Sequence, residues 1–360
     1  MNIWMFAFLL LPIAALSYIG WHIWCLLPLS WIWKTLAIAL LVGSFLLMFL
    51  NIGRVIDHLP LSVATASYDI GNSSIFVLLY VFMLFLVLDL GRLIHLLPRT
   101  LFYNNWWTAG AVFAFVFMLF LYGNLHYQDK YRQELTIGSQ KITKPVKLVM
   151  MSDLHLGYHN RRSEFHRWVD MVNAEHPDMV LIAGDIIDMS MRPLIEENMA
   201  EEFRRLEAPV YACLGNHEYY SGEPEAQRFY RDAGIRLLQD DVATVGELAI
   251  IGRDDRTNLR RDSLATLTQR TDMQKFTILL DHQPYRLDQA ERMGIDFQFS
   301  GHTHHGQVWP ISWITESIYE CAFGEHRRGA TRYYVSSGIG IWGGKFRIGT
   351  RSEYVVLNLQ

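Results

Sequence analysis

The sequence predicts an all-α transmembrane helical domain followed by an α/β soluble domain. Charge is divided unevenly along the 360 residues: of 32 lysines and arginines and 36 aspartates and glutamates, only seven lie before Gln128. Long apolar stretches fill that first third, as in membrane proteins. Further along, short apolar runs alternate with helical patterns, which is typical of βαβ units. We therefore expect a membrane domain at 1–128, a linker at 129–147 and a soluble domain at 148–360.

The apolar stretches predict about four transmembrane helices. The stretch Leu36–Ile52, of 17 residues, is about 26 Å long at 1.5 Å per residue, which nearly spans the hydrocarbon core. The stretches are Ile3–Trp24, Leu36–Ile52, Ile75–Leu88 with a continuation toward Leu97, and Trp106–Leu125. No basic residue precedes Ile3, so a cleavable signal peptide is a poor interpretation. We expect a multi-pass protein of the cell (inner or plasma) membrane. Basic residues are equally numerous on the two sides of the predicted spans, so the sequence does not determine on which side of the membrane the soluble domain lies.

Charged residues near the membrane have two interpretations each. Asp89 and Arg92 lie three residues apart on one helical face. They either neutralise each other near the end of the span or mark a functional site inside the membrane. The five lysines and arginines of the linker 129–147 either face solvent or hold the soluble domain against anionic lipid headgroups.

Polar residues follow five apolar strands of the soluble domain. In parallel sheets ligands collect at the carboxyl ends of strands. Carboxylate, amide and imidazole groups are typical metal ligands. A single Asp-x-His also fits an ordinary polar turn, but five strand ends of this kind indicate a site. The strands and the polar residues after them are Val146–Met151 with Asp153 and His155, Met179–Ala183 with Asp185, Pro209–Leu214 with Asn216 and His217, Phe276–Leu280 with His282, and Ile295–Phe299 with His302 and His304.

Composition excludes two other classes. From Asp129 onward there are 28 basic and 33 acidic residues, a net charge of −5, so no basic footprint for nucleic acid is present. The three cysteines, Cys25, Cys213 and Cys321, form neither a disulfide framework nor a zinc-knuckle spacing. The oligomeric state is left open.

Residues 145–359 resemble the calcineurin-like metallophosphoesterases, and in particular the membrane-bound branch of transmembrane proteins with a metallophosphoesterase domain. The resemblance implies a four-layer α-β-β-α sandwich with a two-metal site on one sheet edge. The family motifs are complete and in order: Asp153-Leu154-His155, Gly184-Asp185-Ile186-Ile187-Asp188, Gly215-Asn216-His217-Glu218, His282, and Gly301-His302-Thr303-His304.

The resemblance also implies a role for each site residue. Two divalent metal ions (Mn, Fe or Zn) would be the cofactors, and the ligand types do not choose among them. His217 would face the substrate, protonating the leaving oxygen or stabilising charge on the transferred phosphoryl group. Asp185 would bridge the metals, with Asp153, His155 and His304 completing one and Asn216, His282 and His302 completing the other.

Several neighbouring residues have open roles. Asp188 would support the ligands, and Glu218 either orients His217 or lies on the surface. His305 stands where the branch has glycine, and it either faces solvent or contacts the substrate. Arg347 follows a glycine-rich loop and either meets a phosphate or has a structural role. Closing strands are expected at Trp309-Pro310, Tyr333–Gly338 and Tyr354–Leu359.

Three functional hypotheses follow. The first is a membrane-bound phosphoesterase that hydrolyses a phosphate ester or pyrophosphate bond of a lipid-linked substrate, such as one similar to UDP-2,3-diacylglucosamine. In the second, the enzyme is a phosphodiesterase of soluble nucleotides and the membrane is only an anchor. In the third, the domain is a non-catalytic receptor or scaffold, although no ligand of the family pattern is missing. The bilayer itself is the one partner that all three share.

Overall fold

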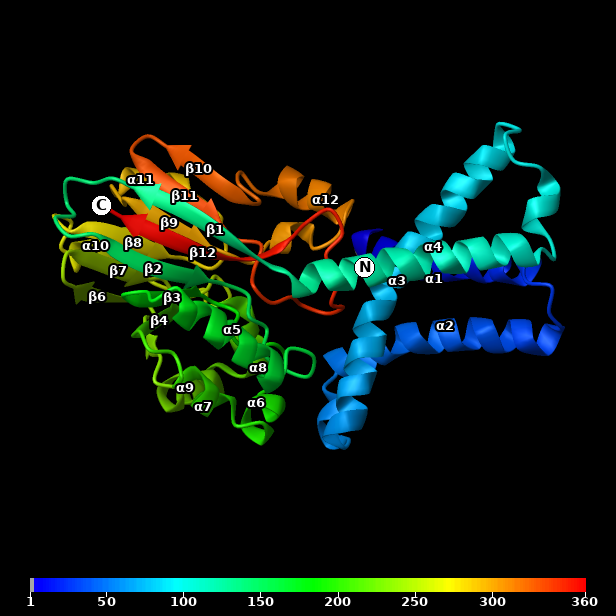
Figure 1. Cartoon of the computed structure of the whole chain (residues 1–360), viewed down its shortest axis with the longest axis horizontal. Helices are drawn as coiled ribbons and strands as arrows, with labels where there is room; N and C mark the ends of the chain where they lie inside the picture. Colours follow the sequence, from blue (N-terminus) through cyan, green and yellow to red (C-terminus); the bar gives the residue numbers. More distant parts are fainter. Residues whose placement is uncertain (1–2) are drawn as a thin grey trace. The chain divides into compact units, whose positions relative to one another are not determined.

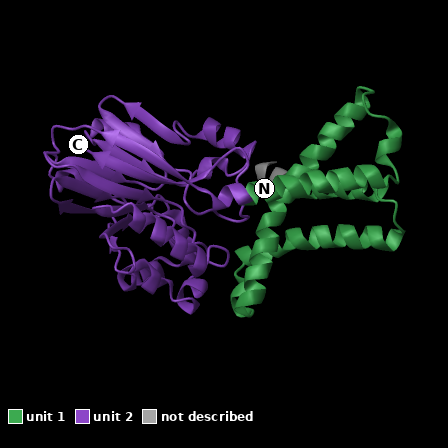
Figure 2. Cartoon of the chain, in the orientation of Figure 1, with its two compact units in different colours: residues 1–124 green, residues 125–360 purple. Residues whose placement is uncertain are grey.

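The chain forms two compact units. The computed structural model describes residues 3–360, with side chains from Leu10 onward (Figure 1). Unit 1 comprises residues 1–124 and unit 2 residues 125–360 (Figure 2). Each unit is described separately below.

Unit 1 is helical, as the sequence predicts. By length and composition α2, α3 and α4 are each able to cross a membrane, whereas the described side chains of α1 cover only a shorter apolar segment, Leu10–Leu26. The predicted helices are therefore all present, and three of them are candidate spans. The elements are α1 (Ile3–Leu26), α2 (Trp31–Ile52), the 3-10 turn η1 (Val55–His58), α3 (Leu61–Leu93), the 3-10 turn η2 (Arg99–Phe102) and α4 (Trp106–Gln128).

Helix α3 begins fourteen residues before the predicted start at Ile75. Its first half carries small and polar residues that pack against α2. A Cβ on Gly71 would lie 2.8 Å from the backbone nitrogen of Met48, so only glycine allows this approach. The Asn51 side chain donates to the Ser67 carbonyl and accepts from the Ser67 hydroxyl. Small residues and hydrogen bonds of this kind hold helices together in lipid, where apolar side chains provide no net driving force.

Asp89 contacts other polar side chains in addition to Arg92. Its carboxylate lies 3.5 Å from Arg92, which is the predicted neutralising contact. The hydroxyl of Tyr18 also donates to it at 2.6 Å, and Nε2 of His22 lies at 3.0 Å. These four side chains therefore tie α1 to α3.

Unit 2 contains two six-stranded mixed sheets. The first has the order β1-β12-β2-β3-β4-β5 and the second β10-β11-β9-β8-β7-β6. Parallel pairing joins β2, β3, β4 and β5, and likewise β7, β8 and β9, so the carboxyl ends within each set share one edge. The strands are β1 (Lys130–Ile137), β2 (Val146–Met151), β3 (Met179–Ala183), β4 (Val210–Cys213), β5 (Arg236–Leu237), β6 (Asp241–Val245), β7 (Leu248–Gly252), β8 (Phe276–Leu280), β9 (Phe297–Ser300), β10 (Gly324–Arg328), β11 (Thr331–Val335) and β12 (Ser352–Leu359).

Alternation along the strands produces the four-layer α-β-β-α sandwich. In β2, Leu148 and Met150 belong to the core between the two sheets, whereas Val149 and Met151 belong to the core under the helices. Successive side chains of a strand point to opposite faces, so one fully apolar strand supplies both cores. The helices of the unit are α5 (Arg162–Ala174), α6 (Arg192–Glu196), α7 (Met199–Phe203), α8 (Asn216–Ser221), α9 (Glu223–Asp232), α10 (Leu264–Gln269), α11 (Asp288–Arg292), α12 (Ile311–Ile318) and the 3-10 turn η3 (His304–Gly306).

Two elements differ from the sequence-based expectation. Strand β1 lies inside the segment 129–147 that was expected to be a linker, and it pairs in parallel with β12 at the edge of the first sheet. The expected closing strand at Trp309-Pro310 is wrong: these residues lead directly into helix α12. The Pro310 ring lacks the N–H that a strand ladder needs but is compatible with a helix start.

The last turn of α4 is built into unit 2. Tyr127 is fully buried, and its hydroxyl lies 2.7 Å from a Glu164 carboxylate oxygen and 2.9 Å from the Asn160 amide oxygen. Asn160 in turn donates to the carbonyl of Leu154, between two predicted metal ligands. The end of this helix is therefore in hydrogen-bond contact with the loop that follows β2.

We expect Tyr127→Phe to lower the unfolding free energy of unit 2 by about 1–3 kcal/mol, because buried oxygen atoms lose a hydrogen-bond partner. The measurement is thermal or denaturant unfolding of the full chain in detergent. The matched control is Tyr131→Phe, since the Tyr131 side chain is about half exposed. Equal stability of the two variants would contradict the structural role of the Tyr127 hydroxyl.

Candidate metal centre

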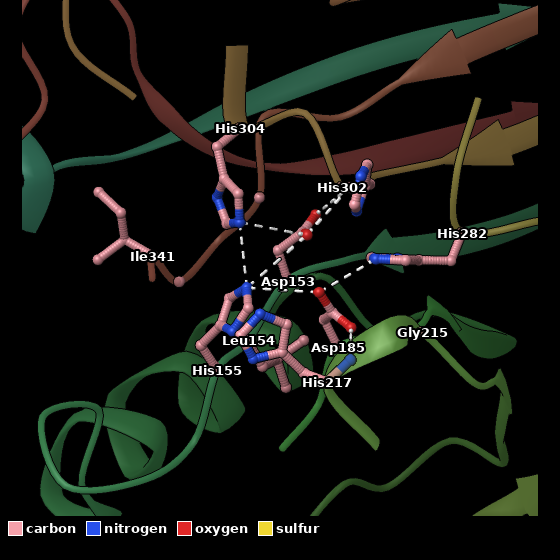
Figure 3. A network of polar contacts seen from close by, with 12 residues as sticks. Asp153, Leu154, His155, Asp185, Gly215, His217, His282, His302, His304 and Ile341 are labelled. Atoms are coloured by element: carbon pink, nitrogen blue, oxygen red, sulfur yellow. Dashed lines mark hydrogen bonds and ion pairs between the residues drawn. The ribbon is translucent and has the colours of Figure 1, made fainter. Parts of the chain in front are cut away.

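The strand ends of both sheets bring the predicted site residues together (Figure 3). Asp153 and His155 follow β2, Asp185 follows β3, and His282 follows β8. His302 and His304 follow β9, while Asn216 and His217 begin α8 directly after β4. All of these side chains are buried or partly buried. The arrangement expected from parallel strand ends is thus present.

Asp185 lies between two groups of donor atoms. Its Oδ2 is 3.7 Å from Nε2 of His155 and 3.1 Å from Nε2 of His282. On the His155 side, Nε2 of His304 lies 3.0 Å from Nε2 of His155 and 3.4 Å from Oδ1 of Asp153. Three sets of residues each offer donor atoms within 4.8 Å of one another: Asp153, His155 and His304; His155, Asp185 and His217; and Asp185, His282 and His302.

The donor atoms fit bound cations. The Asn216 amide oxygen is buried without a hydrogen-bond partner among the described residues, and leaving such a group unsatisfied costs about 1–3 kcal/mol. Two imidazole nitrogens, of His155 and His304, face each other at 3.0 Å beside a carboxylate. Cations accept lone pairs from groups of both kinds. Nitrogen and oxygen ligands together suit first-row transition metals.

Left-handed backbone conformations recur at the site. The φ angles are 54° at Asp153, 44° at His155, 51° at Asp185, 71° at His302 and 48° at His304. Such angles are uncommon outside glycine, and strain of this kind gathers at functional sites. Backbone hydrogen bonds stabilise the turns: the amide of Asp153 donates to the Gly184 carbonyl, and that of His155 donates to the Asp185 carbonyl.

Two motif glycines leave space for carboxylates. A Cβ on Gly215 would lie 2.2 Å from Oδ1 of Asp185. A Cβ on Gly301 would lie 2.2 Å from Oδ2 of Asp153. Any larger residue at either position would displace a carboxylate, which explains why glycine precedes Asn216 and His302.

Asp188 supports two of the imidazoles. Its Oδ1 lies 3.2 Å from Nδ1 of His155 and 3.4 Å from Nδ1 of His217. Burial alone would raise the pKa of the Asp188 carboxyl, but hydrogen bonds from both histidines outweigh burial and hold its pKa far below the usual range. A carboxylate on Nδ1 fixes the tautomer that presents Nε2 to a metal. The expected supporting role of Asp188 agrees with this geometry.

The histidines differ in their electrostatic surroundings. Burial, with the charge of His282, lowers the pKa of His302 to about 4, and burial likewise lowers the pKa of His304. Both are therefore neutral near pH 7, which is the form that binds metals. Burial would also lower the pKa of His217, but the charges of Asp185 and Asp188 outweigh it and raise that pKa to about 9.

Glu218 is not on the surface, and its carboxylate binds backbone groups. The carboxylate is fully buried and accepts backbone N–H groups of Gly215 at 2.7 Å, Ile187 at 3.0 Å and Asp185 at 3.1 Å. It therefore joins the turn after β3 to the turn after β4. The surface interpretation is wrong, and the role of Glu218 in orienting His217 stays a prediction.

Arg347 and His305 also have structural contacts. Arg347 is fully buried and donates to the carbonyl oxygens of His304 and Ser337, so its guanidinium holds a site turn and does not reach the surface. His305 lies 2.9 Å from the Glu316 carboxylate of α12, and its ring stacks on Phe323 at 4.6 Å. No motif spacing in the sequence indicates these partners.

A family model for "Calcineurin-like phosphoesterase" matches residues 146–306. The "Transmembrane protein with metallophosphoesterase domain" of Danio rerio is 30% identical over 350 residues, which cover 88% of this chain and 77% of that protein. An "Uncharacterized metallophosphoesterase" of Aquifex aeolicus is 30% identical over 241 residues, 63% of this chain and 91% of that protein.

A third relative, an uncharacterized metallophosphoesterase of Campylobacter jejuni, is 34% identical over 226 residues, which cover 61% of this chain and 60% of that protein. The chain spans less than two thirds of the length of this protein and of two similar Helicobacter pylori proteins.

We expect Glu218→Gln to lower the unfolding free energy by about 1.5–3 kcal/mol, because an amide offers one acceptor oxygen where three N–H groups converge on two. Denaturant unfolding of the full chain in detergent measures the change. The control is Glu225→Gln, which removes only a surface ion pair with Arg228 and should change stability by less than about 1 kcal/mol. If Glu218→Gln were as stable as this control, Glu218 would not join the two turns.

Proposed function

The chain belongs to the calcineurin-like phosphoesterase family, and from this we propose that it is a membrane-bound two-metal phosphoesterase. The observation that carries the proposal is the position of Asp185 between two groups of donors from both sheets. A carboxylate in that position can bridge two cations. The candidate spans α2, α3 and α4 in the same chain support a location in a membrane.

We assign the metal ligands by their place in the two groups. Asp153, His155 and His304 hold one ion, and Asn216, His282 and His302 hold the other, with Asp185 shared. When bound, two such ions, manganese, iron or zinc, clamp phosphoryl oxygens and lower the pKa of a coordinated water.

His217 is the proposed acid. Its ring centroid lies 4.5 Å from that of His155, and Asp188 orients it through Nδ1 at 3.4 Å. The other ring nitrogen, Nε2, is then the atom that delivers a proton to the leaving oxygen or stabilises charge on the transferred phosphoryl group. A partly exposed edge of the side chain supports access for a substrate, since 11% of its surface is exposed.

The proposed substrate is a phosphate ester or pyrophosphate carried by a lipid, similar to UDP-2,3-diacylglucosamine or another phospholipid. The membrane unit supports this class, because an enzyme with its own spans meets lipid substrates without extracting them from the bilayer. The alternative hypothesis is that a membrane-anchored domain hydrolyses soluble nucleotides. The third hypothesis is a non-catalytic receptor or scaffold. Experiments separate the three.

We expect Asp185→Asn to remove most of the bound metal and to lower turnover by at least about 100-fold, because a neutral amide cannot bridge two cations. Metal per chain is measured by mass spectrometry after purification in detergent, and turnover is measured with manganese added after chelation. The control is Asp232→Asn on α9, an exposed carboxylate, which should change neither quantity. Full activity of Asp185→Asn would reject the proposed metal site, and a metal-loaded wild type without turnover on any ester would favour the scaffold.

We expect the full chain to hydrolyse lipid-linked phosphates faster than soluble nucleotides, because the spans hold the soluble unit at the bilayer. The measurement compares kcat/KM for diacyl phospholipids, nucleotide-linked lipids and free nucleotides in one detergent. If kcat/KM for free nucleotides equals that for the lipid-linked phosphates, the helices serve only as a membrane anchor, and the alternative hypothesis is supported.

A further inference from the structure

Helix α12 exposes an apolar face. Trp313 is 62% exposed, Ile314 56% and Ile318 57%, and these positions lie within one side of a helix. Trp309, just before the helix, is 39% exposed and contacts the Trp313 ring edge-on at 5.3 Å. We call these four residues the α12 face.

The exposed apolar side chains of the α12 face are close together in the sequence, whereas those elsewhere in unit 2 are not. Other large apolar side chains exposed in the described part of unit 2 are scattered singly: Leu125, Tyr131, Ile195, Tyr220 and Leu259. Single exposed apolar residues are normal, whereas a contiguous group marks an interaction site. Four such residues within ten positions form a group.

The fold of unit 2 does not depend on this face. The inner side of α12 is held by other contacts: Ser312 is buried, and a Cβ on Gly306 would lie 2.3 Å from the Ser312 amide. Glu316 accepts from His305 at 2.9 Å, and the Trp309 amide donates to the Ile348 carbonyl at 2.7 Å. Trp313, Ile314 and Ile318 are exposed and take no part in these contacts.

Unit 2 connects this face to the point where the chain leaves α4. The buried Tyr127 contacts Glu164, and Glu164 also pairs with Lys345. The segment that carries Lys345 continues to Ile348, which bonds to Trp309 at the start of α12. A short series of contacts thus joins the end of a candidate membrane span to the α12 face, and all of it lies within unit 2.

We propose that the α12 face inserts into the headgroup region of the lipid bilayer. Tryptophan favours the membrane interface, and isoleucine favours the acyl boundary below it. The candidate spans α2, α3 and α4 of the same chain supply the reason for a bilayer as the partner, because they would keep unit 2 within reach of a membrane.

Insertion of the α12 face would also affect how a substrate reaches the metal centre, and this consequence rests on the proposed function. His304 begins the 3-10 turn η3, and η3 leads within a few residues to α12. With α12 at headgroup depth, the metal centre opens beside the lipid headgroups. The scissile phosphate would then be reached without moving the acyl chains out of the bilayer.

The test places an environment-sensitive fluorophore on the α12 face of the full chain. Ser317 is exposed and lies between Trp313 and Ile318 on the helix surface, so Ser317→Cys adds a labelling site and keeps the apolar residues. Cys25→Ser removes the partly exposed native thiol, while Cys213 and Cys321 are buried. The matched control label is Ala265→Cys, an exposed position on α10 at the other end of unit 2 (Figure 1).

Both proteins carry an NBD label and are reconstituted in phosphatidylcholine and phosphatidylglycerol vesicles, with or without lipids that bear a nitroxide near the top of the acyl chain. We expect the label at position 317 to emit at shorter wavelength and to lose at least half of its emission to the nitroxide, whereas the label at 265 does neither. Adding Trp313→Ser and Ile318→Ser should return the label at 317 to the behaviour of the control. Equal emission and equal quenching at 317 and 265 would overturn the proposal.

Quenching does not require turnover, so it separates this proposal from the proposed function. An inserted face with no hydrolysis on any ester would retain the membrane contact and reject the enzyme. Hydrolysis with an unquenched label would retain the enzyme and reject the contact. If both hold, Trp313→Ser with Ile318→Ser should reduce kcat/KM for a lipid phosphate in vesicles several-fold and leave kcat/KM for a soluble ester unchanged.

Discussion

The structure of unit 2 depends on holding several carboxylates close together in a buried site. Asp153, Asp185, Asp188 and Glu218 are each at most 2% exposed. Buried like charges repel strongly unless they are paired or hydrogen-bonded. Here imidazoles lie beside the aspartates, and backbone N–H groups converge on Glu218. What remains unmatched, such as the Asn216 oxygen, is suited to cations.

The strained turns follow from the same constraint. Five proposed ligands have positive φ angles, which bend the chain back immediately after each strand and direct the side chains to one place. Each turn is stable only because other turns hold it: Glu218 accepts from the turns after β3 and β4, and Arg347 holds the turn at His304. The two sheets provide the fixed edges on which these turns rest. A site of this kind therefore requires the whole sandwich and not a single motif.

The sequence predicts features that depend on neighbouring residues in the chain. It does not predict contacts between residues that are far apart in the chain. Apolar runs and the residues that follow them are adjacent in the chain, so the strand ends and the sandwich were predictable from patterns, together with the family resemblance. Arg347 and Glu218 were not placed, because their partners lie in turns that only the fold brings near. The start of α3 was missed because Ser67 and Gly71 resemble loop residues until they pack against α2. Helix α12 was missed because eight residues after a proline carry too little periodicity to distinguish a helix from a strand.

Unit 2 has two features that bear on the membrane, the exposed side of α12 and the buried Tyr127. A flexible tether would leave the soluble unit free to turn, and no particular face would need to be apolar. Tyr127 instead continues α4 into the hydrogen bonds of Glu164 and Asn160, and Asn160 bonds to the loop that carries Asp153 and His155. Within unit 2, the last turn of α4 is thus fixed by hydrogen bonds, and the contiguous group of exposed apolar residues in the described part of this unit is the α12 face. If the α12 face inserts into the bilayer as proposed, the metal centre of the same unit would stay near the lipid headgroups, where the phosphate of a lipid lies.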